Sequence, residues 1–422
     1  MFNKYDAYKD SGVEWLGEIP EEWSIKPGLV AFSENKRSNK GMVRNTVFSL
    51  SYGKIIIKPE EKLVGLVPES FETYQLVEPS DIIIRCTDLQ NDQTSLRTGL
   101  AKDAGIITSA YLNLNVKQGF DSKYLHYYLH ALDTTKVLYK LGSGLRQNLS
   151  FLDFKRLPVL DIPLSEQKKI SSFLDQKTSE IDQAIAIKEQ QISLLNERKQ
   201  IVIQKAVTQG LNPNVAMKDS GVEWIGQIPE HWECKPSRYA FRAVKRFKRD
   251  GSEIKFSVTQ KWGVIPTDEM KENSTQAESF SGFQICLADD LVLNKYKAHL
   301  GVFWRAPSRG LITGNYTVFE PLKGINSKYF ELLYHTPVYI DIFRTIVYGI
   351  VEGMMPLYNN DFYDMLSVVP PLNEQLEIVK FVEGEQKKFA SIEHVYLMQI
   401  EKLKEYKTTL INDAVTGKIK VV

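Results

Sequence analysis

The sequence predicts an α+β protein in which two mixed α/β domains are separated by two long antiparallel helices, with the pseudo-twofold symmetry of an internal duplication. One observation is a repeated leader, because KDSGVEWLGEIPEEW at residues 9–23 returns as KDSGVEWIGQIPEHW at residues 218–232. Another is PLSEQKKISSFLD at residues 163–175, which returns as PLNEQLEIVKFVE at residues 371–383. These offsets of 209 and 208 residues far exceed the period of a solenoid, which is about 20–50 residues. They indicate one half-molecule that has been duplicated and fused.

A third observation is that the sequence after each of these motifs closes in the same way, with AVTQG at residues 206–210 and AVTGK at residues 414–418. A length of 422 residues allows two to four domains with their own cores. We expect a first mixed domain with its leader at 1–163, a first helix at 164–210, a second mixed domain with its leader at 211–370, and a second helix at 371–422.

Short β-branched and aromatic runs follow each leader. Alternating or apolar runs of this length, broken by Gly, Pro and Asn, are typical of strands. A short helix is expected after them in each half, at residues 122–132 and 327–337. The predicted strand regions are 46–58, 81–86 and 105–116 in the first half, and 253–265, 290–296 and 310–322 in the second half.

A long helix is expected at the end of each half. Pro163 and Pro371 precede the helices, and Ser165 and Asn373 lie where an N-cap belongs. Apolar residues recur about every 3.5 positions, which predicts two stripes that pack against each other. Forty-odd residues at 1.5 Å each make a rod roughly 60 Å long, which ends near Gly210 or Gly417. The predicted packing residues are Ile181, Ile185, Ile192, Leu195 and Val202 in the first helix, and Phe389, Ile392, Tyr396, Leu403 and Leu410 in the second, where Gln399 and Tyr406 continue the rhythm.

The composition is that of an ordinary globular protein, and a net charge of +1 excludes a uniformly basic surface. One run, Lys235–Lys261, carries nine Lys or Arg residues against two acidic residues, and is either a solvated face or an electrostatic patch. Cys86, Cys234 and Cys286 are far apart, which supports neither a disulfide framework nor a zinc cage. The sequence shows no long apolar run and no signal-peptide core, so we expect a soluble, cytoplasmic protein.

The sequence lacks the motifs of enzymes that act on DNA. It has no N/D-P-P-Y/F tetrapeptide of an adenine methyltransferase, and neither Gly53-Lys54 nor Gly417-Lys418 has the spacing of a P-loop. Asp153-Phe154-Lys155 resembles a nuclease fragment but has no credible acidic partner. His126 and His130 have the i, i+4 spacing of metal ligands, but no third ligand is apparent, which favours an ordinary helix face. We therefore expect no catalytic residue, metal site or cofactor in this chain.

The mixed domains are where the two halves diverge, because they share only scattered positions such as Gly105/Gly310 and Thr108/Thr313. The shared parts are therefore expected to perform the same function in both halves, and the divergent parts to recognise two different targets. Two function classes remain. The first is a non-catalytic reader of DNA sequence, since a duplex suits a pseudo-twofold protein. The second is a scaffold that holds two identical protein partners without reading DNA. The local basic surplus favours the first class.

The ordered pair of leader and helix motifs resembles the specificity subunit of a type I restriction–modification system, over essentially the whole chain. In that family the divergent segments are target recognition domains, each of which reads one half of a split DNA sequence. The resemblance implies that the helices set the gap between the half-sites and dock two methylation subunits. The matching residues are Trp15, Gly17, Ile19, Pro20 and Trp23 with Trp224, Gly226, Ile228, Pro229 and Trp232, followed by Pro163, Leu164, Glu166 and Gln167 with Pro371, Leu372, Glu374 and Gln375.

The same resemblance implies the partners. The chain would bind double-stranded DNA and two methylation subunits, and it would meet restriction subunits through the complex. S-adenosylmethionine, ATP and Mg are then expected on the partner subunits, which supply adenine-DNA methyltransferase and ATP-dependent endonuclease activity.

Side chains that could touch DNA lie in loops beside the predicted strands, because phosphates need basic donors and base edges need amide or planar groups. The leader tryptophans could stack on bases, but at duplicated positions they more readily pack a helix junction. One departure between the halves is that Met354 occupies the position matched to Arg146. The candidates are Lys36, Arg37, Lys40, Arg44, Tyr52, Lys54, Arg85, Thr87, Gln90, Asn91, Arg97, Arg146 and Gln147 in the first half, and Lys245, Arg246, Lys248, Arg249, Gln260, Lys261, Trp262, Asn294, Lys295, Tyr296 and Lys297 in the second.

Overall fold

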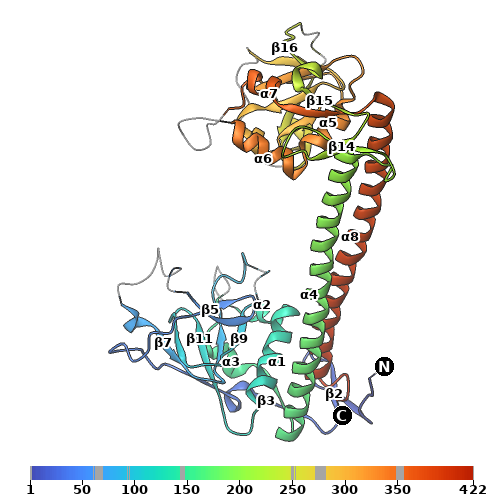
Figure 1. The fold of residues 1–422 in the computed structure, drawn as a ribbon. Helices are drawn as coiled ribbons and strands as arrows, with labels where there is room; N and C mark the ends of the chain where they lie inside the picture. Colours follow the sequence, from blue (N-terminus) through green and yellow to red (C-terminus); the bar gives the residue numbers. More distant parts are fainter. Residues whose placement is uncertain are drawn as a thin grey trace. The chain divides into compact units, whose positions relative to one another are not determined.

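The computed structural model describes residues 2–59, 61, 70–92, 94, 96–142, 148–248, 251, 253–270, 282–347 and 356–421. The chain divides into two compact units, which are Met1–Lys188 with Leu397–Val422, and Glu189–Tyr396. Each unit holds one mixed domain and a stretch of both long helices (Figure 1). The predicted α+β architecture with two long helices is confirmed. In the described part of the chain, no helix combines the length and apolarity needed to cross a membrane.

The repeated leader forms a small antiparallel hairpin in both units. β1 (Tyr8–Asp10) pairs with β2 (Glu18–Pro20), and β13 (Met217–Asp219) pairs with β14 (Gln227–Pro229). The last tryptophan of each leader, Trp23 or Trp232, is buried. A Cβ built on Gly417 or Gly210 would approach its ring within 2.8 or 3.1 Å. These two tryptophans therefore pack the junction between leader and long helix.

A pair of short strands closes each mixed domain at its base. β3 (Ser24–Pro27) pairs antiparallel with β12 (Pro158–Asp161), and β15 (Glu233–Pro236) pairs antiparallel with β24 (Leu366–Val369). The chain thus enters and leaves each domain through two hydrogen-bonded strands. We call each pair a neck.

Among the described residues, each mixed domain has two larger sheets in addition to its neck. The first has the order β4-β11-β8-β9 in one unit and β16-β23-β20-β21 in the other. The second joins the hairpin β5-β6 to β10-β7 through the bridge Val47–Ile106, and its counterpart is β18-β17-β22-β19. The strands are β4 (Phe32–Glu34), β5 (Phe48–Ser51), β6 (Lys54–Ile57), β7 (Gln75–Val77), β8 (Ile82–Ile84), β9 (Thr98–Leu100), β10 (Gly105–Ile107) and β11 (Leu112–Val116), then β16 (Phe241–Val244), β17 (Ile254–Thr259), β18 (Gly263–Pro266), β19 (Gln284–Cys286), β20 (Leu291–Asn294), β21 (Phe303–Arg305), β22 (Gly310–Ile312) and β23 (Tyr316–Pro321).

The matched glycines Gly105 and Gly310 explain one of the few positions that the divergent domains share. A Cβ on Gly105 would lie 2.6 Å from the Phe48 ring, and one on Gly310 would lie 2.1 Å from the Phe256 ring. Real Cβ atoms do not approach other atoms so closely, so the second sheet of each unit requires glycine here.

Short helices cover one face of the four-stranded sheets. In the first unit, α1 lies between the sheet and the long helix α4 (Figure 1), and Asp175 of α4 accepts hydrogen bonds from Lys123 and Tyr127 of α1. The helices are α1 (Ser122–Thr134), α2 (Val137–Leu141), α3 (Phe151–Arg156), α4 (Leu164–Gln209), α5 (Ser327–Tyr334), α6 (Pro337–Ile346), α7 (Asn359–Asp364) and α8 (Leu372–Val415), and the 3-10 turns are η1 (Gly28–Val30), η3 (Phe71–Thr73), η4 (Ser237–Tyr239), η5 (Thr267–Glu269) and η6 (Lys295–Leu300).

The stripe on α8 runs along a different line from the predicted one. Phe389 and Leu410 are buried and Tyr396 and Leu403 are half-buried, but Ile392 is 41% exposed. Glu393, Ile400 and Lys407 take the positions assigned to Ile392, Gln399 and Tyr406. The prediction followed apolar side chains, whereas the actual stripe admits Lys407, whose Nζ pairs with Asp182 of α4 at 2.7 Å. On α4, Ile181 is buried, and Ile185, Ile192, Leu195 and Val202 are half-buried.

The repeated glutamine of each long helix anchors a domain to it. The helices start at Leu164 and Leu372, so Ser165 and Asn373 lie in the first turn and are not N-caps. Gln167 Oε1 accepts the Asp121 N–H at 2.8 Å, and its Nε2 donates to Ile162 O and Gly119 O. Gln375 makes the same three bonds to Asn326 N, Pro370 O and Gly324 O.

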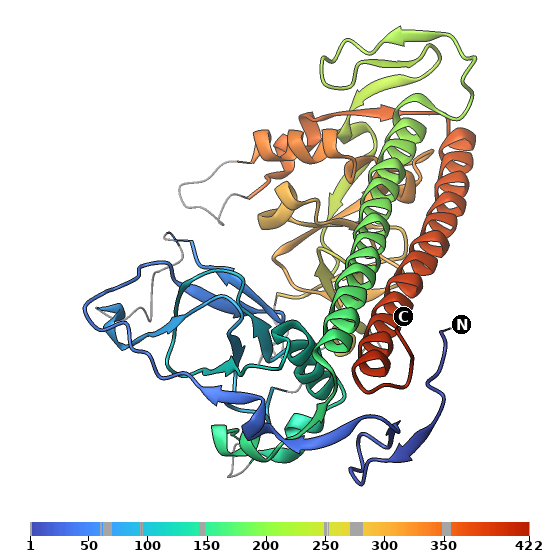
Figure 2. The same ribbon diagram turned by 90° about the horizontal axis from the view of Figure 1, so that it is seen from below.

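A second repeated contact ties each domain to the end of the other long helix. Tyr124 Oη donates to Val415 O at 3.0 Å, and Tyr329 Oη donates to Val207 O at 2.7 Å. In the first unit the two chain termini also lie close together (Figure 2), and Asn3 and Lys420 form a β-bridge. Each unit is therefore assembled from segments of both halves of the sequence.

Candidate nucleic-acid interface

In each unit, a hairpin and a loop that carry candidate residues lie side by side. A Cβ on Gly53, in the turn of β5-β6, would lie 3.2 Å from Leu96, which precedes β9. A Cβ on Gly263, the first residue of β18 after the turn of β17-β18, would lie 3.2 Å from Trp304 of β21. The loops after β8 and β20 return to these same strands, β9 and β21. In each unit, the β5-β6 or β17-β18 hairpin therefore lies at the same edge as the loop after β8 or β20.

Both hairpin tips expose an aromatic side chain beside a lysine. Tyr52 is 88% exposed, and both it and Gly53 have positive φ values of 47° and 73°, as a type I′ turn requires. Trp262 is 51% exposed, and Lys261 Nζ lies 4.4 Å from the centre of its ring. Exposed aromatic faces beside cations suit contact with bases and phosphates.

The loop after β8 is held from inside by Arg97, which is fully buried. Its guanidinium donates to the carbonyls of Arg85, Thr87, Asp88 and Asp92. We predicted from the sequence that Arg97 contacts DNA, and that prediction must be corrected, because its side chain is enclosed by protein. Sequence alone could not show this, since the partners of Arg97 are backbone carbonyls.

The loop after β20 is built differently. It forms the 3-10 turn η6, which starts with Asn294 Oδ1 accepting the Tyr296 N–H at 3.2 Å and ends at Gly301 with φ of 74°. Lys295 Nζ lies 5.3 Å from the centre of the Tyr296 ring. Val302, also fully buried, occupies the place of Arg97, because Asn294 N donates to Val302 O as Arg85 N donates to Arg97 O.

Arg37 and Arg246 form equivalent ion pairs with buried aspartates. Arg37 Nη2 lies 3.5 Å from Asp81, and Arg246 Nη1 lies 2.6 Å from Asp290. Burial raises the pKa of both aspartates, although hydrogen bonds and the arginines oppose the shift. Arg246 also pairs with Glu320 at 3.1 Å, and Arg44 pairs with Glu78 at 2.8 Å. These arginines therefore form ion pairs that stabilise the fold, in addition to any contact with DNA.

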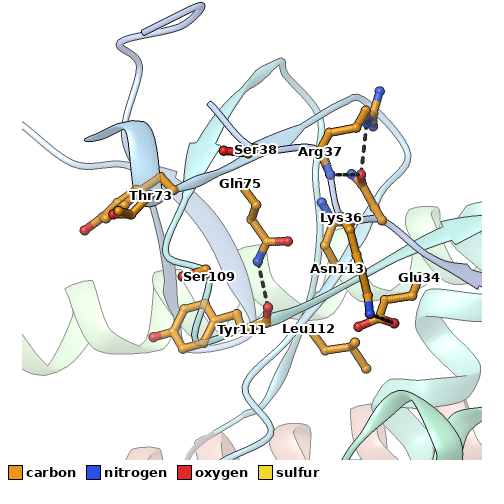
Figure 3. A pocket seen from close by; sticks show the side chains of 12 residues that line it. Glu34, Lys36, Arg37, Ser38, Thr73, Gln75, Ser109, Tyr111, Leu112 and Asn113 are labelled. Carbon is orange, nitrogen blue, oxygen red and sulfur yellow. Dashed lines mark hydrogen bonds and ion pairs between the residues drawn. The ribbon is translucent and has the colours of Figure 1, made fainter. Parts of the chain in front are cut away.

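A polar cavity of about 270 Å³ opens beside Arg37 in the first unit (Figure 3). Its wall includes Lys36, which pairs with Glu34 at 3.0 Å, and the amide side chains of Gln75 and Asn113. Gln75 Nε2 donates to Tyr111 O at 2.6 Å. In the second unit, Gln284 Nε2 donates to Tyr316 O at the same distance. This glutamine contact is thus part of the duplicated framework.

The remaining candidates are mostly on the surface. Arg146, Gln147 and Arg249, together with Met354, lie outside the described residues. Half-buried candidates are Arg44 and Arg85 in the first unit, and Arg246, Asn294 and Lys295 in the second. Exposed candidates are Lys36, Arg37, Lys40, Tyr52, Lys54, Thr87, Gln90 and Asn91, then Lys245, Lys248, Gln260, Lys261, Trp262, Tyr296 and Lys297.

Sequence reasoning missed four buried polar residues of the framework around Arg37 and Arg246. Gln75, Asp81, Gln284 and Asp290 are all buried. A signal was present, because QLVEPSDIII at 75–84 matches QICLADDLVL at 284–293 in polar positions as well as apolar ones. Polar residues that recur inside buried strands indicate hydrogen-bonded framework positions.

His126 and His130 lie on α1. Burial lowers the pKa of each to about 4, with Lys407 contributing at His130. Across the described ranges, no cluster of three or more His, Cys, Asp or Glu side chains could hold a metal ion. The two histidines are therefore neutral packing residues near pH 7.

Comparison with known proteins finds similar structures but no similar sequences. No family model and no curated protein matches the sequence. Among solved structures, the chain is similar to one described as the structural basis of complex assembly and conformational transition of the type I R-M system. The TM-score is 0.66 and the sequence identity is 12%, and the match covers 94% of this chain and 98% of that chain. It is also similar to the HsdS subunit from Thermoanaerobacter tengcongensis, with a TM-score of 0.54, 14% identity, and coverage of 95% and 98%. With its duplicated leaders, necks and long helices, the chain has the fold of a type I restriction–modification specificity subunit.

Proposed function

We propose that this chain is the DNA-recognition subunit of a type I restriction–modification complex and is not itself an enzyme. Each mixed domain reads one half of a bipartite DNA target. The long helices set the gap between the half-sites and dock two methylation subunits. S-adenosylmethionine, ATP and Mg act on the methylation and restriction subunits, which this chain directs to their target.

One observation carries the proposal. The same strand pair, β8-β9 in one unit and β20-β21 in the other, closes two differently built loops. The framework around them repeats down to single contacts, such as Gln75 to Tyr111 O and Gln284 to Tyr316 O. A duplicated framework with divergent exposed loops is what reading two different half-sequences requires.

The experiment that tests the proposal is methylation mapping in cells with and without this chain. We expect adenine methylation at a split sequence that disappears when the chain is removed. A purified complex with the methylation subunits should also bind duplex DNA with a strong salt dependence. A complex that assembles but binds no duplex would support the alternative function, a scaffold for two identical partners.

A first prediction concerns the exposed lysines of the basic run. Arg246 is occupied by Asp290 and Glu320, whereas Lys245 and Lys248 are the exposed lysines beside it that can meet phosphates. Replacing both with Ala should reduce the log–log salt slope of duplex binding by about 0.9 for each lost contact. The slope is measured by titrating the assembled complex with duplex at several salt concentrations.

The matched control is the pair Lys323→Ala and Lys380→Ala, which removes the same charge from exposed positions of the same unit. Lys245 follows the end of β16 at which Val244 pairs with Val318, whereas Lys323 lies beyond the other end, where Phe241 pairs with Pro321. The control should leave the slope unchanged. Equal salt slopes for the two double variants would show that Lys245 and Lys248 lie on an ordinary solvated face and do not contact DNA phosphates.

A second prediction concerns the long helices. Lys188 and Glu189 are consecutive in α4, and Tyr396 and Leu397 are consecutive in α8, but each pair spans the border between the units. Four residues inserted at both borders add about 6 Å of helix and about 40° beyond a full turn. Because DNA rises about 3.4 Å per base pair, the methylated sequence should show a gap longer by one or two base pairs.

In the same experiment, both half-sequences should stay the same. An insertion in α4 alone is the control, because it shifts the stripe of one helix against the other and should reduce activity. A doubly inserted, active variant with the original gap would show that the helices dock partners but do not set the spacing.

A further inference from the structure

Arg97 is enclosed in the first unit with every donor of its guanidinium occupied. Nε donates to Tyr139 Oη at 3.1 Å, and Nη1 donates to Thr87 O at 2.8 Å and Arg85 O at 3.3 Å. Nη2 donates to Asp88 O at 3.2 Å and Asp92 O at 2.5 Å. Arginine has five N–H donors in a planar fork, and each has one acceptor here. Four of the five acceptors are backbone carbonyls of a single loop, residues 85–92.

This loop is arranged around the guanidinium. Its carbonyls at four positions turn inward to Arg97, and Leu89 is buried beneath it. Thr87, Gln90 and Asn91 are exposed on the outside. Further bonds fix the loop, because Arg85 and Asp92 at its ends pair at 3.1 Å and Asp88 N in its middle donates to Asn148 Oδ1 at 2.9 Å. Asp88 has a positive φ of 61°, a conformation that persists only where its surroundings impose it.

The cation is essential to this arrangement. Without the guanidinium, the part-buried carbonyls of Arg85, Thr87 and Asp92 would each lose the hydrogen bond that it donates, and each such loss is unfavourable. Asp88 O would keep a bond from the Asp92 N–H. Lysine offers three donors on a point charge and cannot match the fork. In the second unit, Val302 stands in the equivalent place, and backbone groups hold η6, because Leu357 N donates to Lys295 O and Val302 N donates to Lys297 O.

We propose that Arg97 is the positioning residue for base recognition in the first half-site, holding the loop 85–92 so that Gln90 and Thr87 meet base edges in one fixed geometry. The inference rests on the proposed DNA-recognition function. Arg97 itself touches no DNA. A glutamine amide fixed in this way can pair with the two major-groove groups of adenine, and a bidentate contact discriminates only when its position is held.

The central test is the Arg97→Lys variant in the assembled complex with the methylation subunits. Methylation mapping should show discrimination reduced about tenfold at base pairs read by this loop, all of them in the first half-site. The second half-site should be unchanged. The salt slope of duplex binding is measured on Arg97→Gln, because lysine would keep the positive charge. It should be unchanged, whereas the loss of a direct phosphate contact would lower it by about 0.9.

Two further variants separate positioning from general stability. Tyr139→Phe removes one acceptor of the guanidinium and should relax the same base pairs to a smaller extent. Val159→Ala leaves the loop intact but removes packing from a buried residue of β12. At a temperature where its unfolding free energy matches that of Arg97→Lys, it should keep full first-half discrimination.

A double-mutant cycle with Gln90→Ala completes the test. At the base pair that Gln90 reads, the Arg97→Lys and Gln90→Ala double variant should be no less specific than Gln90→Ala alone if Arg97 acts through Gln90. Additive losses, a reduced salt slope, or equal relaxation in Val159→Ala would each overturn the proposal. Failure of the proposed function is a separate result, since the unaltered complex would then show no sequence-specific methylation.

Discussion

Exchanging residues 24–161 for the equivalent segment of another protein of this fold should replace one half of the DNA target and leave the other half intact. The reason lies in the neck, where Ser24 pairs with Asp161 and Pro27 pairs with Pro158. A segment cut at these positions begins and ends in one hydrogen-bonded strand pair. The incoming domain can therefore close on itself before it meets the leader or the long helices. Methylation mapping of the chimaera measures both half-sequences at once.

The reciprocal exchange provides the control. Residues 233–369 are closed by the second neck, in which Glu233 pairs with Val369, and their replacement should change only the other half-sequence. An exchange of residues 24–100 would separate β3 from β12 and β8 from β11, and should give an unstable chain. If either exchange at the necks altered both half-sequences, independent reading by the two domains would be refuted.

The Gln375→Ala variant should destabilise the second unit by about 3 kcal/mol, because it breaks the three hydrogen bonds of a buried glutamine and leaves their partners unsatisfied. Two of those partners, Asn326 N and Gly324 O, flank the start of α5, and the third, Pro370 O, follows the neck. The loss should therefore loosen the mixed domain from α8. Urea unfolding of the purified chain measures the change in stability.

Gln399→Ala is the matched control, since Gln399 is an exposed glutamine on the same helix, and its removal should cost little. Gln167→Ala should reproduce the effect in the first unit, where Asp121, Gly119 and Ile162 are the partners. Unfolding curves for Gln375→Ala and Gln399→Ala that coincide would contradict the anchoring role given to the repeated glutamine.

Much of the fold could be predicted because the chain repeats itself. The leader and helix motifs recur with their spacing, and period-2 apolar runs mark strands such as 105–116, which the structure divides into β10 and β11. The α8 stripe could not be placed from apolar residues alone. Lys407 lies on it because Asp182 faces it, and that partner is 225 residues away in sequence.

The interface was harder to predict, because exposure depends on contacts that local sequence does not encode. Tyr52 and Lys54 lie at a hairpin tip, where turn residues and alternation indicate an exposed position. Arg97 has the same chemistry as an exposed DNA-binding arginine, but loop carbonyls enclose it. Arg37 and Arg246 are paired with Asp81 and Asp290, whose role became visible only with the sheet in place.

The contacts of Tyr124 and Tyr329 with the ends of the opposite long helices, at Val415 and Val207, have a genetic consequence. The two leaders are nearly identical in amino-acid sequence and lie 209 residues apart, so a deletion that joined them would remove one half-molecule. The shortened product would keep one leader, one mixed domain and one long helix. Its tyrosine would no longer find the second helix in its own chain, and only another copy could supply it. Such a deletion would produce an obligate pair that addresses an inverted repeat of a single half-sequence.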